Sequence, residues 1–305
     1  MILSKSKVRY SKQHIKKELE WLSFILPTVV CLLVLTYWPT FQAIRYSFYD
    51  VSVIGFNEKF VGFRNYGIIL SNNKFLLSVW NTVYLGMVGL LVIPFGFFLA
   101  SAINSLRKGK LQTIFRLGFY LPNIITGVSI ILIFQYILQV DNGMVNAILS
   151  MIFNKKIQIG WLSDPDLAKI GASIISIWAS LGYNMLICLA GLQSIPNELY
   201  EAAMVDGASS FRRLRHITIP SLRGTFVFLF ITGIINSFSR FTDLFILSGS
   251  SAAGRPYGAL QSILMFIYQY SFDNPAYGFA CAGSIILFIL VMSVTCVNLK
   301  VTKLL

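Results

Sequence analysis

The sequence predicts an all-α membrane protein with six transmembrane helices. The chain has 305 residues, of which 56% are hydrophobic and only 12% are charged, whereas soluble domains carry about a quarter charged residues. Six apolar runs reach the length of about 20 residues that a helix needs to cross a bilayer. Basic residues gather between these runs, as is typical of cytoplasmic loops that face anionic lipid. This distribution of the net charge of +13 therefore indicates that the basic residues face a lipid bilayer and do not bind nucleic acid.

The N-terminal segment, residues 1–20, is strongly basic and fixes the expected orientation. Its lysines and arginine place the N-terminus in the cytoplasm by the positive-inside rule. The apolar run that follows is too long for the core of a cleavable signal peptide, so we expect it to be retained as an anchor. Six crossings then return the C-terminus to the cytoplasm. The transmembrane domain spans residues 21–300, with expected helices at about 21–48, 76–106, 117–140, 167–194, 224–247 and 276–299.

The first two spans differ in their content of proline and glycine. Pro27 and Pro39 fall near the two ends of the first span, where a missing backbone donor costs least. The second span contains Gly86, Gly89 and Gly96, small residues that allow helices to approach closely. A short basic loop leads from the second to the third span. The charge of that loop and the count of crossings both place it in the cytoplasm.

Two extracytoplasmic segments contain apolar stretches of their own. Within residues 141–166, the stretch MVNAILSMIF predicts a short helix that lies on the membrane surface. The fourth and fifth spans follow. Within residues 248–275, the stretch LQSILMFIYQYSF predicts a re-entrant or interfacial helix before the sixth span.

A polar, helix-forming segment at residues 196–220 separates the fourth and fifth spans, on the cytoplasmic side. Asn197 is a candidate N-cap, since its side-chain oxygen can accept from backbone N–H groups. Gly207 is expected to end a first helix in a left-handed conformation, and a second short helix is expected over about 209–216. The chain has no Gly-rich nucleotide loop of the GxxxxGK[ST] type. Uphill transport would therefore need a partner or an ion gradient.

The pattern inside this segment resembles the EAA loop of permease subunits in bacterial ABC importers. The matching residues are Glu201, Ala202 and Ala203, then Asp206, Gly207 and Ala208, then Phe211, Ile217 and Pro220. In that family the loop forms a coupling helix that docks into a groove on a separate ATPase. The resemblance implies that Ala202, Ala203 and Phe211 pack against the ATPase, that Gly207 makes the turn, and that Glu201 caps the helix or pairs with loop arginines.

The resemblance extends to most of residues 20–300. The stretches LGFYLPNIITGVSIILIFQYIL, GWLSDPDLAKIGASIISIW and SFSRFTDLFILSG are similar to carbohydrate permeases of the maltose-transporter and multiple-sugar-transporter type. This implies a type I importer permease of the bacterial inner membrane that carries a carbohydrate, with an oligosaccharide as the expected cargo. The implied partners are a second homologous permease, two ATPase subunits and an extracytoplasmic sugar-binding protein.

The chain is not expected to be an enzyme. The resemblance implies that ATP and Mg²⁺ bind to the partner ATPase subunits, so that this chain has no catalytic residues and binds no cofactor. His14 and His216, the two histidines, are not surrounded by a metal or acid–base constellation. We therefore expect no metal site.

Polar residues near the fourth and fifth spans are candidates for the substrate path. Asn184, Asn236, Arg240 and Asp243 are expensive at membrane depth unless they face a cavity or a partner. The last three are spaced four and three residues apart and so would share a helix face. One hypothesis is that this face hydrogen-bonds sugar hydroxyls. The other is that Arg240 and Asp243 form a structural ion pair at the outer end of the fifth span.

Aromatic residues beside these positions could stack on sugar rings. Tyr183, Phe238 and Phe241 are the candidates, although ordinary packing explains most aromatics in a chain that is 14% aromatic. Two other classes of function stay open from the residues alone. An ion-gradient-driven secondary transporter would show paired intramembrane carboxylates or an inverted repeat, and neither is evident. A membrane anchor without transport is the second alternative.

Overall fold

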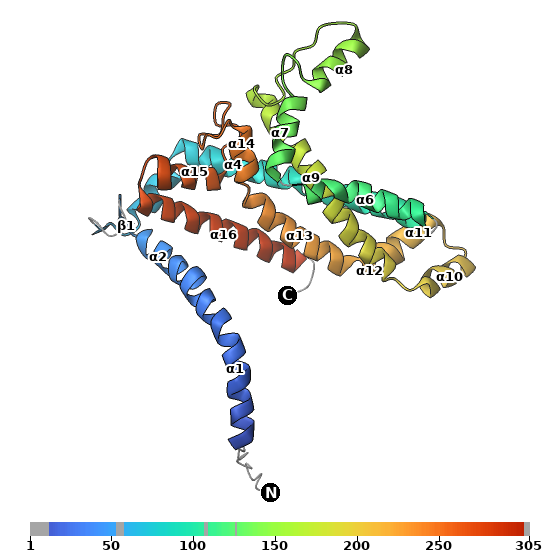
Figure 1. Cartoon of the computed structure of the whole chain (residues 1–305), viewed down its shortest axis with the longest axis horizontal. Coiled ribbons are helices and arrows are strands. Elements are labelled where there is room, and N and C mark those ends of the chain that lie inside the picture. Colours follow the sequence, from blue (N-terminus) through green and yellow to red (C-terminus); the bar gives the residue numbers. More distant parts are fainter. Residues whose placement is uncertain (1–11, 53–57, 107–108, 126, 302–305) are drawn as a thin grey trace.

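The chain folds almost entirely into helices, several of which lie side by side to form one body (Figure 1). The computed structural model describes residues 12–52, 58–106, 109–125 and 127–301. In these ranges four helices are long and apolar enough to cross a membrane, and two bent helix pairs bring the number to six. The all-helical, polytopic fold predicted from the sequence is thus present. The single helices are Trp21–Tyr46, Asn73–Ser105, Pro165–Gln193 and Tyr277–Lys300, and the pairs are Lys110–Ile124 with Gly127–Ile137 and Ser210–Ser221 with Arg223–Phe238.

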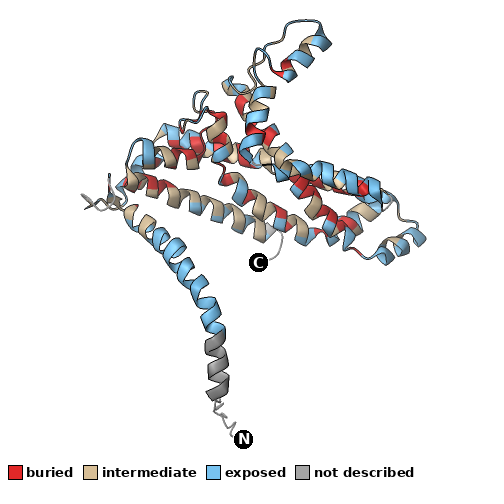
Figure 2. Ribbon diagram, in the orientation of Figure 1, coloured by how far each residue is buried: buried red, intermediate tan, exposed pale blue. Residues whose placement is uncertain are grey.

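The first span is a long helix that extends away from the rest of the molecule. It comprises α1 (Lys12–Leu32), η1 (Leu33–Tyr37) and α2 (Trp38–Tyr46). No residue in the most apolar stretch of this helix is buried within the chain. The side chains of the helix are exposed along most of the length that is described (Figure 2). Its apolar surface therefore faces outward in the isolated chain.

A small two-stranded sheet follows and is the one departure from an all-α chain among the described residues. Strand β1 (Tyr49–Asp50) pairs antiparallel with β2 (Lys59–Phe60). Helix α3 (Arg64–Leu70) is tied to this sheet by Asn65, whose amide donates to the carbonyls of Ser47 and Tyr49 at 2.9 and 2.8 Å. Two residues per strand are too short to predict from alternation of polar and apolar residues.

The second and fourth spans form the main helix pair. The second span consists of α4 (Asn73–Gly89) and α5 (Val92–Ser105), and the fourth is α9 (Pro165–Gln193). A Cβ atom added to Gly96 would lie 2.9 Å from Cβ of Asn184 and 3.1 Å from the Met185 nitrogen. Gly96 thus lets α5 approach α9 closely, as the small residues of this span predicted.

The third and fifth spans are broken, which corrects the continuous helices expected at 117–140 and 224–247. Helices α6 (Lys110–Ile124) and α7 (Gly127–Ile137) differ in direction by 95°. Helix α13 (Arg223–Phe238) ends before Arg240, and α14 (Thr242–Leu247) begins a new segment. Hydropathy alone reports the length of an apolar run and is blind to a change of direction within it.

The two short helices expected outside the spans are both present, but their environments differ. Helix α8 (Met144–Phe153) coincides with the predicted stretch and projects from the body (Figure 1). Helix α15 (Ile263–Tyr268) continues into η3 (Gln269–Asp273) and packs against α4 and α16 (Tyr277–Val301). Ile263, Met265 and Phe266 are fully buried there. This helix therefore belongs to the interior of the fold.

Candidate functional site

Two features gather the residues singled out from the sequence: the loop between α9 and α13, and a cavity between the helices. The loop, residues 196–220, contains α10 (Asn197–Val205), α11 (Ser210–Arg213), η2 (Leu214–Thr218) and the start of α12 (Ile219–Ser221). It lies at one edge of the molecule, where α10 projects beyond the body (Figure 1). We call it the connecting loop.

Gly207 ends α10 in the manner predicted from the sequence. Its φ of +71° is left-handed. The N–H of Gly207 donates to the Met204 carbonyl at 3.0 Å, and the N–H of Ala208 donates to the Ala203 carbonyl at 2.8 Å. These two bonds form a Schellman motif, in which glycine satisfies carbonyls that the helix leaves free. Ser209 then caps α11 by accepting from the Arg212 nitrogen.

The start of α10 differs from the prediction. Pro196 occupies the N-cap position, and Asn197 is already the first helical residue, so its side chain does not cap the helix. Glu201 is exposed, and among the described residues it makes no ion pair with the loop arginines. Arg213 of α11 instead donates to the Ser210 hydroxyl at 3.1 Å. Glu201 thus makes neither contact in the isolated chain, and its capping or pairing role stays a prediction.

The remaining predicted loop residues lie on the surface or close to it. Ala203 and Ala208 are half-buried, while the others are exposed: Glu201, Ala202, Asp206, Gly207, Phe211 and Pro220. Val205 is 89% exposed, and Leu199, Met204 and Phe211 are also exposed apolar side chains. Sequence reasoning passed over Met204 and Val205, although apolar residues inside a polar loop were a usable signal. The loop thus presents an apolar surface to the outside.

Tyr200 connects α10 to η2 within the connecting loop. Its hydroxyl lies 3.0 Å from the hydroxyl of Thr218, near the end of η2. Its ring packs against the buried cluster that α5, α9 and α13 share, which includes Leu192 and Leu222. Tyrosine suits this place because it offers both an apolar ring and a polar tip. No sequence pattern distinguished it from other aromatics.

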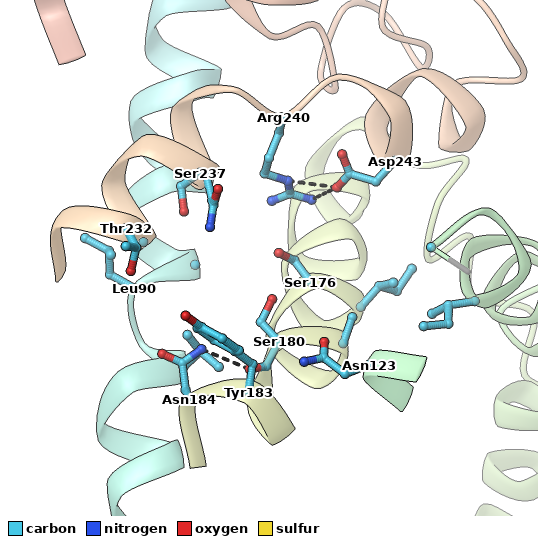
Figure 3. Close-up of a pocket in the computed structure, with 18 of the residues that line it drawn as sticks. Leu90, Asn123, Ser176, Ser180, Tyr183, Asn184, Thr232, Ser237, Arg240 and Asp243 are labelled. Atoms are coloured by element: carbon cyan, nitrogen blue, oxygen red, sulfur yellow. Dashed lines mark hydrogen bonds and ion pairs between the residues drawn. The ribbon is translucent and has the colours of Figure 1, made fainter. Parts of the chain in front are cut away.

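The cavity has a volume of about 440 Å³ and lies between α5, α7, α9 and α13. Figure 3 shows Arg240 and Asp243 on one side and Tyr183 and Asn184 on the opposite side. Its lining is rich in groups that can donate or accept hydrogen bonds. These are Asn123, Ser176, Ser180, Tyr183, Asn184, Thr232, Asn236, Ser237, Arg240 and Asp243.

Five of the seven residues predicted for a substrate path line this cavity: Tyr183, Asn184, Asn236, Arg240 and Asp243. Phe238 and Phe241 do not. Phe238 is only 2% exposed, and its ring packs where a Cβ on Gly86 would come within 3.0 Å of it. Phe238 is therefore a core residue that fills the space left by a glycine. The lining serines, Thr232 and Asn123 were missed, because single hydroxyl and amide residues in apolar runs carry no pattern.

Arg240 and Asp243 form an ion pair and also face the cavity, so the two hypotheses about them are compatible. Nε of Arg240 donates to Oδ2 of Asp243 at 2.8 Å, and Nη2 contacts the same oxygen. The expected shared helix face is wrong, because α13 ends at Phe238. The turn between α13 and α14 brings Asn236, Arg240 and Asp243 to one cavity.

The described residues contain no group of three or more His, Cys, Asp or Glu that could hold a metal ion. The chemistry that the cavity offers is hydrogen bonding by hydroxyls and amides, together with one ion pair. The cavity lies among helices long enough to cross a membrane. This arrangement suits passage of a polar solute through an apolar barrier.

Comparisons with known proteins match most of the chain. Residues 92–299 match the family described as "Binding-protein-dependent transport system inner membrane component". The chain is 32% identical to the multiple sugar-binding transport system permease protein MsmF of Streptococcus mutans, over 92% of this chain and 94% of that protein. It is 33% identical to the trehalose/maltose transport system permease protein MalF of Thermococcus litoralis, over 99% of this chain and 97% of that protein.

The fold is also similar to that of a solved structure. The structure is a crystal structure of a bacterial ABC transporter involved in the import of the acidic polysaccharide alginate. The TM-score is 0.82 at 23% sequence identity, over 95% of this chain and 97% of that one. At this level of identity the likeness concerns the fold.

Proposed function

We propose, since this chain belongs to the family of binding-protein-dependent inner-membrane permeases of carbohydrate ABC importers, that it forms part of the path for an oligosaccharide. The chain is a multi-pass inner-membrane component and the permease of a sugar importer, and the ATPase resides in a separate subunit. Family membership sets aside the two alternatives, a gradient-driven secondary transporter and an anchor without transport.

The observation that carries the proposal is the polar cavity between the spans. Hydroxyl and amide groups line it on several helices, and such groups exchange hydrogen bonds with sugar hydroxyls at little net cost. Its volume of about 440 Å³ lies within the range of about 300–1,000 Å³ typical of small-molecule sites. Tyr183 adds an exposed aromatic ring on which a sugar could stack. An oligosaccharide would occupy this space a few sugar units at a time.

The names of the relatives favour the same cargo class. One is named for multiple sugars and another for trehalose and maltose, so an oligosaccharide of neutral sugars is a suitable first probe. The importer would contain this chain, a second homologous permease, two ATPase subunits that bind ATP and Mg²⁺, and an extracytoplasmic sugar-binding protein. Both chain termini would then lie in the cytoplasm, as the basic N-terminal segment indicates.

The connecting loop would receive force from the ATPase. Support comes from its position at the edge of the fold and from its exposed apolar side chains, above all Val205 and Phe211. In the proposed cycle, ATP binding closes the ATPase dimer and draws the connecting loops together. The spans then rock to an outward-facing state, accept sugar from the binding protein, and return inward after hydrolysis.

Uptake by the intact complex tests the cargo. Cells that express this chain with the other subunits of the proposed importer are given radiolabelled trehalose, maltose, maltotriose and raffinose. We expect ATP-dependent uptake of at least one of them, and Asn236→Leu should raise its KM about 2- to 10-fold because one hydrogen bond is lost. Thr242→Val, which removes a hydroxyl outside the cavity lining, is the matched control. Failure to take up any of the four sugars would contradict the proposed oligosaccharide cargo.

Substitutions in α10 test the docking role. Ala203→Glu places a charge on the expected contact surface, and Gly207→Pro is incompatible with a φ of +71°. Both should abolish uptake and sugar-stimulated ATP hydrolysis and reduce recovery of the ATPase subunit with the chain, while the chain remains in the membrane. Gln193→Glu adds the same charge just outside the loop and should have little effect. Normal sugar uptake by both loop variants would contradict the proposed docking role.

A further inference from the structure

The charge of the cavity is set by two residues. Among the described residues that line it, Arg240 and Asp243 are the only ones with ionisable acidic or basic side chains, apart from the phenol of Tyr183. They are paired with each other through Nε and Nη2 of the arginine and Oδ2 of the aspartate. The cavity lining therefore carries one positive and one negative charge, which cancel.

The pair is held in place on the arginine side. Nη2 of Arg240 also donates to the Ala172 carbonyl on α9 at 3.3 Å, and the Ser262 hydroxyl donates to the Arg240 carbonyl at 2.9 Å. The arginine side chain is only 8% exposed. Its Nη1 is buried without a hydrogen-bond partner. The cation is thus fixed in the wall between α9, α14 and the turn that precedes α15.

The carboxylate is the more accessible member of the pair. The Asp243 side chain is 29% exposed, against 8% for Arg240. Both side chains line the cavity, and the carboxylate is the less enclosed of the two. A second negative charge brought into this space would be repelled by the carboxylate, would find the guanidinium already paired, and would have to leave water for a poorly polarisable environment.

We propose that the Arg240–Asp243 pair makes the cavity selective for uncharged sugars and excludes uronic acids. The inference rests on the proposed sugar path and adds the class of sugar that the path accepts. Selectivity has two sources: hydrogen bonds stabilise the bound neutral sugar, and charge repulsion destabilises the bound acidic sugar. Asp243 is thus a specificity-determining residue that also prevents the buried guanidinium from attracting anions.

Removing the carboxylate charge should reverse the selectivity. In Asp243→Asn the guanidinium of Arg240 is no longer neutralised and becomes an anion-binding group in a site of low dielectric. The test measures uptake of the best neutral oligosaccharide of the panel above by the whole complex, while trigalacturonate is added as inhibitor. The concentration for half-maximal inhibition should fall about tenfold or more relative to the wild type. Both complexes use the same binding protein, so the difference reports the permease.

A neutral double variant separates charge from shape. Arg240→Gln with Asp243→Asn changes both side chains but leaves no charge, and it should gain no sensitivity to trigalacturonate. If Asp243→Asn does not assemble, as judged by recovery of the ATPase subunit, Arg240→Gln gives the opposite test. It leaves the acid unpaired, and inhibition by chitosan trisaccharide, which carries amines, should become about tenfold stronger.

The outcomes distinguish this inference from the proposed function. Absence of neutral-sugar uptake by the wild type contradicts the proposed function. Neutral-sugar uptake by the wild type, with an inhibition profile unchanged in the charged variants or altered equally in the neutral double variant, overturns the charge-selection inference. Uptake of labelled trigalacturonate by the wild type at the rate of the neutral sugar would overturn it as well.

Discussion

The hydroxyl of Tyr200 lies 3.0 Å from the hydroxyl of Thr218. This contact joins α10 to the end of η2, across the turn at Gly207. The Tyr200 ring continues into the buried cluster between α5, α9 and α13. A displacement of α10 would therefore reach the spans through a side chain as well as through the backbone.

Removal of the Tyr200 hydroxyl should weaken this connection without unfolding the loop. Tyr200→Phe keeps the ring and loses one hydrogen bond, which contributes about 0.5–1.5 kcal/mol. Sugar-stimulated ATP hydrolysis by the reconstituted complex should fall about 2- to 10-fold. Binding of the ATPase subunit should stay close to the wild-type level, because the exposed surface of α10 is unchanged.

A double-mutant cycle isolates the contact. Thr218→Val removes the partner hydroxyl at nearly constant volume, together with its bond of 3.5 Å to the Arg213 carbonyl. The double variant should therefore be no worse than Thr218→Val alone. Additive losses in the double variant would mean that the two hydroxyls act independently.

The left-handed backbone at Gly207 predicts a steep dependence on residue type. A Cβ there meets nothing within 4 Å, so any loss comes from backbone strain and not from a clash. Gly207→Val should cost about 1–2 kcal/mol of local stability and reduce uptake. Gly207→Asn is the control, since asparagine tolerates this conformation best after glycine. Equal uptake by the valine and asparagine variants would argue against the Schellman turn.

Close packing at Gly96 predicts that even a methyl group is harmful. A Cβ at this position would come 2.9 Å from Asn184 Cβ and 3.1 Å from backbone atoms of α9. Overpacking of this kind costs about 1–3 kcal/mol, so Gly96→Ala should lower the Tm of the purified complex. Gly118→Ala is the matched control, because a Cβ there meets nothing and alanine favours a helix. A stable Gly96→Ala variant would contradict the tight α5–α9 contact.

Asn146 should be the residue that holds the segment around α8 together. It is buried, donates to the carbonyls of Val140 and Ile159 at 3.0 and 2.9 Å, and accepts from Nε1 of Trp161 at 2.9 Å. Asn146→Leu leaves these groups unpaired, at a cost of about 1–3 kcal/mol. Faster proteolysis between residues 140 and 161 is the expected readout. Asn142→Ala, at an exposed site nearby, should change nothing, and equal protection of both variants would refute the role.

The sequence predicted what depends on local composition. Long apolar runs gave the spans because a bilayer leaves the backbone few alternatives to a helix. The Gly207 turn followed from the one residue that favours a positive φ, and MVNAILSMIF followed from its own apolar pattern. The EAA pattern pointed to the family, to which the matched residues 92–299 assign the chain. Each of these conclusions needs only residues that are neighbours in the chain.

Tertiary structure decided which residues meet. The break between α13 and α14 in the fifth span lets Asn236, Arg240 and Asp243 line one cavity although they do not share a helix. Phe238, at the end of α13, instead packs in the core against Gly86. The pairing of Tyr200 with Thr218 and the neutrality of the cavity depend on the same three-dimensional arrangement. Hydropathy predicts where a transmembrane helix can form, because backbone polar groups buried in the bilayer must find their hydrogen bonds within the same segment. The direction of each helix is set by packing against partners distant in sequence, and direction determines which side chains face the cavity.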